Sequence, residues 1–494
     1  MGSEKELRLR GQHEISLVRL ILCSMVSGGV QYGWALQLTL LTPYVQTLGL
    51  PHALASLAWL CGPVAGFVVG PTVGLWSDRS RSRFGRRRPF ILTGSVVICI
   101  SVLVIGFSSD IGVALGDTQE SCSTYIGPRW KAAVIYVVGF WALDFANNTV
   151  QGPTRAMMAD LSGKHGCSAA NIIYAFWMAI GNIFGFSSGA GVTWYKWLPS
   201  LMTNSCCEAC ANLKGAFLVA VMFLVICLTV SLIAAKEVMI SDLDYEELES
   251  SGIFSVFQDF KRLPVGMPSV LSVTTLTWLA WFPFLLYNTD WMGREIFHGD
   301  PSGTKQEIES YNKGVQQGAF GLLLNSIVLG ITTMLLEHLC RKVTPRLVWV
   351  MGNFTLFLAM LAITVLSFIS KNRHNSVGTA EEGVKNFALA IEAFLGFPIA
   401  ILLSIPFTYA AQLATNEGGT HQGLAIGVLN ISIVIPQVFV AFSAGPWDAL
   451  FGNGNVPAFA LAGIFAIIAA FFGFTKLPTL ATKTSKIHSF GSMH

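Results

Sequence analysis

The chain has 494 residues, of which 53% are hydrophobic and only 12% are charged. Soluble domains carry about twice that share of charged residues, which excludes a soluble enzyme, a nucleic-acid-binding protein and a disordered chain. The formal net charge of +3 is too small to indicate an acidic partner. The apolar segments are long and continuous, unlike the short alternating strands of a membrane barrel. They therefore predict an all-α protein that crosses the lipid bilayer many times.

Twelve segments are long enough to span a membrane, because a hydrocarbon core about 30 Å thick requires about 20 apolar residues per helix. The first follows a polar N-terminus and is too long for the core of a cleavable signal peptide, so we expect it to be a span. The expected spans are 18–45, 54–77, 89–109, 132–158, 170–193, 213–235, 268–292, 315–337, 347–370, 386–413, 421–444 and 455–476.

A polar stretch at 236–267, rich in acidic residues, separates these spans into two sets of six. We therefore expect two six-helix bundles, at 18–235 and 268–477, joined by this linker. The tails are then residues 1–17 and 478–494. Most of the basic residues fall on the side of the two tails and the linker, which predicts that this side is cytosolic.

The strongest basic cluster is the loop that follows the second span and ends in Arg86, Arg87 and Arg88. It can serve as a topology signal alone. We favour the interpretation that it also forms a cytosolic gate, in which the guanidinium groups pair with helix ends and with Asp78. A weaker basic turn at 340–346 occupies the matching position of the second set. Six plus six helices with matching basic turns suggest the major facilitator architecture, in which the substrate site lies between the two halves.

The ten cysteines do not indicate a metal site. Four lie within apolar spans, while Cys122 and the group Cys206, Cys207 and Cys210 lie in predicted outer loops. Zinc binding by this group is one interpretation, but a second pair of ligands is missing. We favour a disulfide from Cys122 to one of the three, because the outer compartment is oxidising. The glycosylation sequences at Asn147, Asn353 and Asn430 lie inside spans and cannot be used.

The fourth span carries the most informative polar residues. Asp144, Asn148, Gln151 and Arg155 follow one another at helical spacing and form one face, which must line a cavity or another helix. Ionisable residues inside a membrane are costly and usually functional. Asp144 lies in mid-span, about 16 Å along the axis from Arg155 at 1.5 Å per residue, too far for a direct pair. We expect Asp144 to take up and release protons, although a purely structural carboxylate is the alternative.

The first span contributes amides and aromatic rings without charge, including Gln31, Trp34 and Gln37. Such groups suit a neutral sugar, whose hydroxyls need donors and acceptors and whose C–H faces contact rings. Interhelical hydrogen bonding is the alternative explanation. His52 opens the second span at its outer mouth, where it can contact an arriving substrate or simply be solvated.

The seventh span is dense in aromatic residues, including Trp281, and ends in charged ones. Asp290 and Arg294 are four residues apart and can form an ion pair. With Glu295, this pair either stabilises a helix end or forms an outer gate. Glu392 in the tenth span is a second candidate for proton binding.

Several strings resemble the plant sucrose/proton symporters, which belong to the glycoside–pentoside–hexuronide branch of the major facilitator superfamily. They are VQYGWALQLTLLTPYVQTLG, LPHALASLAWLCGP, SDRSRSRFGRRRPF, LDFANNTVQGPTRAMMADLSG, TDWMGREIFHGDP and GVLNISIVIPQ. The resemblance implies that Asp144 binds the coupling proton, that Arg155 is the essential arginine of the same helix, and that His52 is an outer histidine sensitive to substrate. The chain departs from the family at Asn288, where an aspartate is usual, and at Glu392, where an apolar residue is usual.

The resemblance implies a proton-coupled sucrose symporter in the lipid bilayer, without cofactor, metal or nucleic-acid partner. A proton-independent sucrose facilitator and a non-transporting sugar sensor are the alternatives, and an enzyme is not expected. We expect the plasma membrane, with the vacuolar membrane as the other choice. The resemblance and the polar pattern predict substrate contacts, proton coupling and gating by defined residues. The residues predicted to contact substrate are Gln31, Gln37, His52, Asp144, Asn148, Gln151, Trp281, Asp290 and Arg294. Those predicted to couple the proton are Asp144 and Arg155. Those predicted to form gates are Arg86, Arg87, Arg88, Asp290, Arg294 and Glu295.

Overall fold

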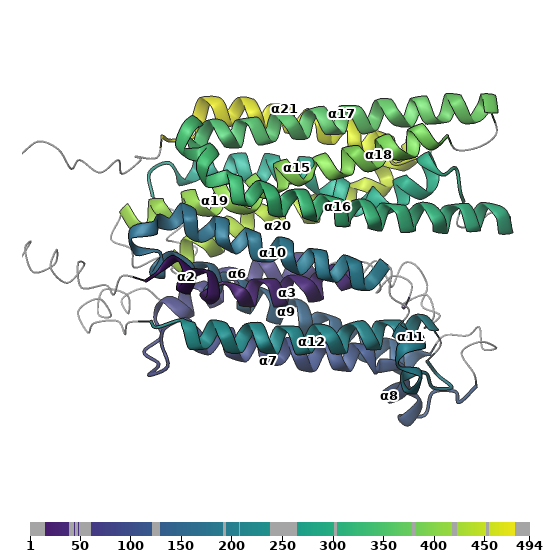
Figure 1. Cartoon of the computed structure of the whole chain (residues 1–494), viewed down its shortest axis with the longest axis horizontal. Helices are drawn as coiled ribbons and strands as arrows, with labels where there is room; N and C mark the ends of the chain where they lie inside the picture. The colour runs from purple at the N-terminus through teal and green to yellow at the C-terminus, as the bar shows by residue number, and fades with distance from the viewer. Residues whose placement is uncertain are drawn as a thin grey trace, which may run out of the picture.

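A computed structural model provides the structure of the protein (Figure 1). It describes residues 15–38, 44, 48, 61–120, 129–190, 194–206, 208–237, 264–300, 304–377, 381–416, 422–450 and 454–479. Within these ranges the regular secondary structure is entirely helical. The all-α prediction is therefore confirmed.

The helices of the first group come from the chain before residue 237. Their bounds are α2 Leu17–Cys23, α3 Met25–Leu36, α6 Cys61–Asp78, α7 Arg88–Gly106, α8 Ser108–Ala114, α9 Trp130–Leu161, α10 Gly166–Ala190, α11 Trp194–Trp197 and α12 Glu208–Ala234. Two short 3-10 turns, η2 Gly163–His165 and η3 Pro199–Leu201, lie between them.

The helices of the second group begin at Met267. They are α15 Met267–Trp291, the π-helical η5 Met292–Ile296, α16 Lys305–Val343, α17 Pro345–Val377, α18 Glu382–Phe394, α19 Gly396–Asn416, α20 Gln422–Leu450 and α21 Val456–Lys476. Figure 1 shows the two groups lying side by side, with the long helices running roughly parallel to one another.

Ten helical segments in the described residues are long and apolar enough to cross a membrane. They coincide with the third to twelfth expected spans. The first two expected spans fall only partly within the described residues, as α2 with α3 and as α6. Large apolar side chains such as Ile226 and Phe471 point outward and are 59% and 65% exposed, as expected of a surface that faces lipid.

Each group of helices has its own buried apolar cluster. One is built almost entirely from residues between Leu20 and Ala235, the other almost entirely from residues between Met267 and Leu477. The groups meet along two seams, where α6 packs on α20 and α10 packs on α16 and α19. Residues on these seams are therefore in position to respond to a movement of one group against the other.

The two ends of the described chain lie at the end of the protein that carries the Arg-rich loop, here named the Arg-loop end. Arg19 near the start of α2 donates to the Ala234 carbonyl at 2.7 Å. Arg88 of the loop donates to the Leu232 carbonyl of the same helix end at 2.7 Å. At the start of α15, Gly266 packs against Pro478.

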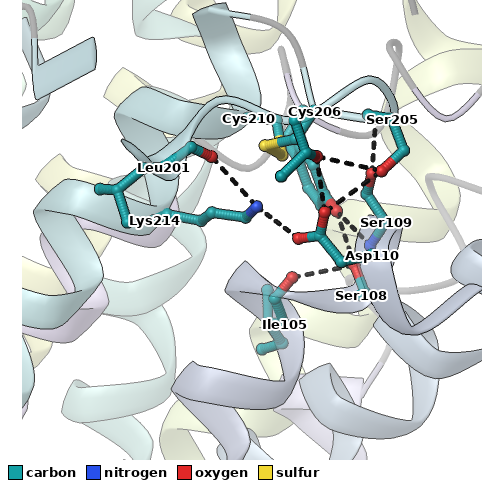
Figure 2. A network of polar contacts seen from close by, with 11 residues as sticks. Ile105, Ser108, Ser109, Asp110, Leu201, Ser205, Cys206, Cys210 and Lys214 are labelled. Carbon is teal, nitrogen blue, oxygen red and sulfur yellow. Dashed lines mark hydrogen bonds and ion pairs between the residues drawn. A yellow bond between two sulfur atoms is a disulfide. The ribbon is translucent and has the colours of Figure 1, made fainter. Parts of the chain in front are cut away.

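At the opposite end of the first group, a buried ion pair joins three segments (Figure 2). The ammonium group of Lys214 on α12, only 1% exposed, pairs with Asp110 on α8. Asp110 also accepts hydrogen bonds from Thr203 at 2.6 Å and Ser205 at 3.2 Å. Lys214 in turn donates to the Leu201 carbonyl at 3.2 Å. This network fixes the loop before α12 onto the end of α7 and α8.

A disulfide joins Cys206 to Cys210 beside this network. It removes both residues from the partners considered for Cys122 and from a zinc site, so neither the zinc interpretation nor those two pairings holds. Cys122 and its remaining partner Cys207 lie outside the described residues, and their pairing stays a prediction.

Replacing Lys214 tests whether the Asp110 network holds the fold. Lys214→Ala leaves the Asp110 carboxylate partly buried without its cation, which costs about 2–3 kcal/mol. We expect a lower midpoint of thermal unfolding in detergent for this variant, whereas Lys196→Ala on the exposed face of α11 should unfold like the unmodified protein. Equal midpoints for both variants would contradict a stabilising role for the pair.

Candidate transport site

The polar face of α9 lies along the seams between the two groups of helices. Asp144 is only 7% exposed. Its carboxyl faces α6 at the point where that helix has Gly62, because a Cβ built there would lie 3.5 Å from Oδ2 of Asp144. The adjacent Cys61 thiol is a side-chain neighbour of the same carboxyl. Asp144 therefore has no cation beside it in the described part of the chain.

One turn further along α9, Asn148 connects the two groups. The Asn430 amide of α20 donates to the Asn148 side-chain oxygen at 3.4 Å and to the Gly66 carbonyl at 3.1 Å. This approach requires small residues on α6, since a Cβ on Gly66 or Gly70 would come within about 3 Å of the Asn430 amide nitrogen. Small residues at four-residue spacing allow membrane helices to pack closely.

Arg155 is buried, at 4% exposed, and reaches the second group. Its guanidinium donates to the Leu403 carbonyl of α19 at 3.1 Å. It also lies between the rings of Tyr174 and Phe407, at 3.9 and 3.6 Å from the ring centroids. Cation–π contacts on both faces stabilise a desolvated guanidinium. Arg155 thus joins α9, α10 and α19 without a carboxylate partner among the described residues.

The hydrogen bonds that join the two groups share one location. Those of Asn148, Gly66, Arg155 and Asp78 lie between the level of Asp144 and the Arg-loop end. The protein is therefore closed by polar contacts on that side of Asp144.

At the Arg-loop end the first group carries a cluster that we name the clasp: Ser77, Asp78, Arg86, Arg87 and Asp160. Arg87 and Asp78 are both fully buried and form an ion pair. Arg87 also donates to Ser77 at 2.6 Å and to Asp160 at 3.2 Å, and Arg86 reaches Asp160 at 2.5 Å. The expected pairing of the Arg-rich loop with Asp78 is confirmed.

Two features carry the clasp into neighbouring segments. The second oxygen of Asp78 accepts the Leu424 backbone N–H at 3.0 Å, in the first turn of α20 in the other group. Helix N-termini favour such carboxylates. Glu237, after the end of α12, accepts the Arg87 backbone N–H at 2.8 Å.

The charges of the clasp respond to their surroundings. Burial lowers the pKa of Arg87, but the Asp78 and Asp160 carboxylates outweigh burial, so the pKa of the guanidinium stands above its usual value. Burial raises the pKa of Glu237, opposed by its hydrogen bond from Arg87. Arg87 therefore stays charged, and the clasp holds as long as the two acids are ionised.

The predicted residues of the first span are buried within the first group. Gln31 is 5% exposed and donates to Asn182 of α10 at 2.9 Å. Gln37 is 2% exposed, and its amide nitrogen has no hydrogen-bond partner. Gln151 of α9 is partly buried. His52 lies outside the described residues.

Trp281 does not join the residues around Asp144 in this structure. It is 1% exposed and lines a small internal cavity, together with Trp349 and Asn353, among α15, α17 and α19. Its indole N–H has no hydrogen-bond partner.

The charged end of the seventh span is tied to its own group. Asp290 accepts a hydrogen bond from the Arg294 guanidinium at 3.1 Å, so the expected ion pair is present. It also accepts a hydrogen bond from the Tyr311 hydroxyl at 2.7 Å. Asn455 at the start of α21 donates to Asp290 at 2.8 Å and, from its backbone, to Glu295 at 2.8 Å. Arg294 and Glu295 lie on the π-helical turn η5. Such turns often occur at functional sites.

Sequence reasoning missed four residues of these clusters: Asp160, Glu237, Asn430 and Asn455. Each lies far along the chain from its partner, 150 residues in the case of Glu237 and Arg87. Asn430 is an isolated amide in an apolar span, and this isolation could have indicated a contact between helices. The sequence analysis treats Asn430 only as part of an unusable glycosylation sequence.

The family model of the Major Facilitator Superfamily (MFS_1) matches residues 20–441 of this chain. The sucrose transport protein SUT1 of Oryza sativa subsp. japonica is 60% identical over 97% of this chain and 91% of its own length. The chain belongs to the plant sucrose transporter family of the Major Facilitator Superfamily. Members of this superfamily are transporters and not enzymes.

Further comparisons agree with this plant sucrose transporter assignment. The sucrose transport proteins SUT3 and SUT4 of the same species are 59% and 50% identical, over 95% and 96% of this chain and 95% and 90% of their own lengths. A structure of the proton:xylose symporter XylE has a TM-score of 0.61 at 13% identity, covering 94% of this chain and 96% of its own. The fucose:proton symporter FucP gives 0.59 at 15%, covering 94% and 100%. These two show a shared fold.

Replacing Arg87 tests the clasp. Arg87→Ala leaves Asp78 buried without its cation, which costs about 3–5 kcal/mol. We expect a lower unfolding midpoint in detergent and reduced sucrose uptake by cells that express the variant. The control Arg83→Ala removes an exposed arginine of the same loop and should match the unmodified protein; if Arg87→Ala matched it too, the clasp would not close the protein.

Replacing Arg294 separates stability from transport. The ion pair is partly exposed, with side chains 39% and 30% exposed, so its loss should cost less than about 1 kcal/mol. We nevertheless expect Arg294→Ala to reach the membrane and to take up less sucrose, because Asp290 and Tyr311 lose their cation. Lys313→Ala, which breaks the exposed pair with Glu309, is the control. Uptake by Arg294→Ala equal to that of the control would reduce the pair to a helix-end feature.

Proposed function

We propose that this protein imports sucrose into the cytosol together with a proton. The relatives of 50–60% identity that match nearly the whole chain are named sucrose transport proteins, which supports sucrose as the substrate. The observation that carries proton coupling is the position of Asp144. Among the described residues it is a buried carboxyl without a cation beside it, facing α6 one turn from Asn148, which contacts the second group of helices.

Asp144 can link the proton to the sugar through its two forms. The neutral carboxyl donates a hydrogen bond to a sugar hydroxyl, whereas the ionised carboxylate only accepts. An ionised Asp144 without a partner is costly in an apolar setting. Sucrose therefore binds well only when the proton is present, and coupling follows from this difference in affinity.

We propose that the rest of the polar face positions the sugar. Asn148 and Gln151 offer amide donors and acceptors one and two turns from Asp144. Gln31 of α3 and Gln37, which directly follows α3, offer two more. Arg155 supplies a permanent positive charge toward the Arg-loop end. It favours ionisation of Asp144 once the protein opens on that side and water enters.

The cycle then consists of two alternating closures. In the present structure the contacts of Asp78, Arg155 and Asn430 close the Arg-loop end, which is the cytosolic end in this proposal. We propose that the tails and the linker lie on that cytosolic side, that the groups 18–235 and 268–477 rock against each other, and that the protein works in the plasma membrane. Rocking breaks the bond between Asp78 and α20.

Replacing Asp144 tests the coupling. Asp144→Asn keeps the shape and a hydrogen-bond donor but removes the titrating proton. We expect sucrose-induced proton currents and uphill accumulation to be lost, at least tenfold below the unmodified protein, while sucrose exchange across the membrane remains. The control Glu309→Gln makes the same chemical change at a side chain that is 68% exposed and should transport normally.

Two results would contradict this assignment. Normal proton currents in Asp144→Asn would show that another group carries the proton. Sucrose that only equilibrates across the membrane in the unmodified protein, without any proton current, would instead make the protein a facilitator.

A further inference from the structure

A second buried acid lies in the other group of helices, away from Asp144. Glu392 on α18 is 0% exposed, and neither of its carboxyl oxygens makes a hydrogen bond. The side chain that acts on it is the Asn288 amide of α15. Asn288 is 1% exposed, and its amide nitrogen and oxygen are also without hydrogen bonds. A carboxylic acid and an amide thus lie together in the apolar interior with their hydrogen-bonding capacity unused.

The packing around Glu392 leaves no room for a metal ion. The carboxyl lies directly against Gly321 of α16, where a Cβ would overlap Oε2. The site is therefore filled by the carboxyl itself. Among the described residues, no group of three potential metal ligands was found anywhere, and a single carboxylate is a poor cation site on its own.

No permanent charge on the surrounding helices faces Glu392. The sequence of α19 has no charged residue, and α16 has none between Gly314 and Leu336. The charged residues of α17 lie at its two ends. On its own helix, Lys385 pairs with Glu382 at 2.8 Å. Near the end of α15, Asp290 and Glu295 accept hydrogen bonds from Tyr311 and Asn455. Arg294 pairs with Asp290.

An ionised carboxylate in this position would be uncompensated, which costs several kcal/mol. The neutral acid fits, because its O–H can donate to the Asn288 oxygen while the Asn288 N–H donates to its carbonyl. Glu392 therefore carries a proton in the described state.

Glu392 also lies beside a break in its transmembrane segment. Helix α18 ends at Phe394, and α19 begins at Gly396 after the single residue Leu395. Pro398 in the first turn of α19 has no N–H to donate to the preceding turn. The Glu392 backbone carbonyl accepts the Asn325 side-chain amide of α16 at 3.0 Å. A proline in this position is a place where a helix bends.

We propose that Glu392 is a second proton-binding site, which holds its proton while α18 packs on α16 and α17 and releases it when α18 tilts at Leu395. The inference rests on the proposed transport function for its role in the cycle. Protonation of Glu392 stabilises the described state, which is closed at the Arg-loop end. Uptake then depends on pH through two carboxyls, Asp144 and Glu392.

The first test needs no transport. Infrared spectra of the full-length protein in lipid vesicles report protonated carboxyls directly, and an ordinary glutamic acid is ionised above pH of about 4.3. At neutral pH we expect protonated-carboxyl absorption from both Asp144 and Glu392, with the Glu392 component lost in Glu392→Gln and retained in Glu382→Gln. Glu382 is the matched control, since its side chain is 80% exposed on the same helix. An unchanged band in Glu392→Gln overturns the proposal.

The second test measures sucrose uptake against pH in the same variants. We expect Glu392→Gln to lose one of two ionisations from the pH profile, with a lower maximal rate and little change in KM. Glu382→Gln should follow the unmodified protein. The double change Asn288→Asp with Glu392→Gln moves the acid to the other member of the pair and should restore the second ionisation, which also shows that the site folds.

Uptake by Glu392→Gln with an unmodified pH profile overturns the role in transport, even if the infrared band is lost. If the transport proposal itself fails, neither the unmodified protein nor any variant accumulates sucrose. The infrared test of the proton on Glu392 is independent of that outcome.

Discussion

The structure depends on one constraint, which is that a charge in an apolar interior must have a partner or be neutral. The protein meets this constraint in three ways. Arg87 is paired with two carboxylates, Arg155 is held between two aromatic rings, and Asp144 and Glu392 have no cation beside them in the part of the chain that the structure describes. The first two arrangements are fixed charges that hold helices together. The third is the basis of our proposal that both acids are neutral and that their ionisation accompanies a change of structure.

The same constraint explains why the closed seam is narrow. Polar atoms that cross between the groups need short, complete hydrogen bonds, and these require close helices. The glycines of α6 allow Asn430 to approach the backbone, and Asp78 completes the first turn of α20. Separating the groups leaves these atoms without partners unless water replaces the lost bonds. Closure and hydration of the seam are therefore alternatives, as alternating access requires.

The sequence predicted the elements better than the contacts. Ten apolar segments and the local pair of Asp290 with Arg294 follow from composition and helical spacing, because both depend on neighbouring residues only. The pairing of the Arg-rich loop with Asp78 could be predicted because the two are adjacent in the sequence. Asp160 and Glu237 could not be found in this way, since nothing local brings α9 and the end of α12 to the loop. The Cys206–Cys210 pairing likewise depends on how the loop before α12 folds.

In the candidate site, too, the sequence predicts which residues share a helix face but not what that face contacts. Periodicity placed Asp144, Asn148 and Arg155 on one face of a helix, and the structure shows what that face meets: α6 at Gly62, α20 at Asn430 and α19 at Leu403. Trp281, chosen for its aromatic surroundings, lies instead inside the second group, because aromatic density does not distinguish a cavity wall from a core. The isolation of Glu392 becomes visible only when its neighbours on α15 and α16 are known.

The most direct test of the account is sucrose accumulation by the purified protein in proteoliposomes, with and without an imposed proton gradient. The account predicts that an inward proton gradient drives sucrose above its external concentration and that a protonophore abolishes the accumulation, while counterflow without a gradient persists. Sucrose that only equilibrates, at the same rate with and without the gradient, would contradict proton coupling through buried neutral acids.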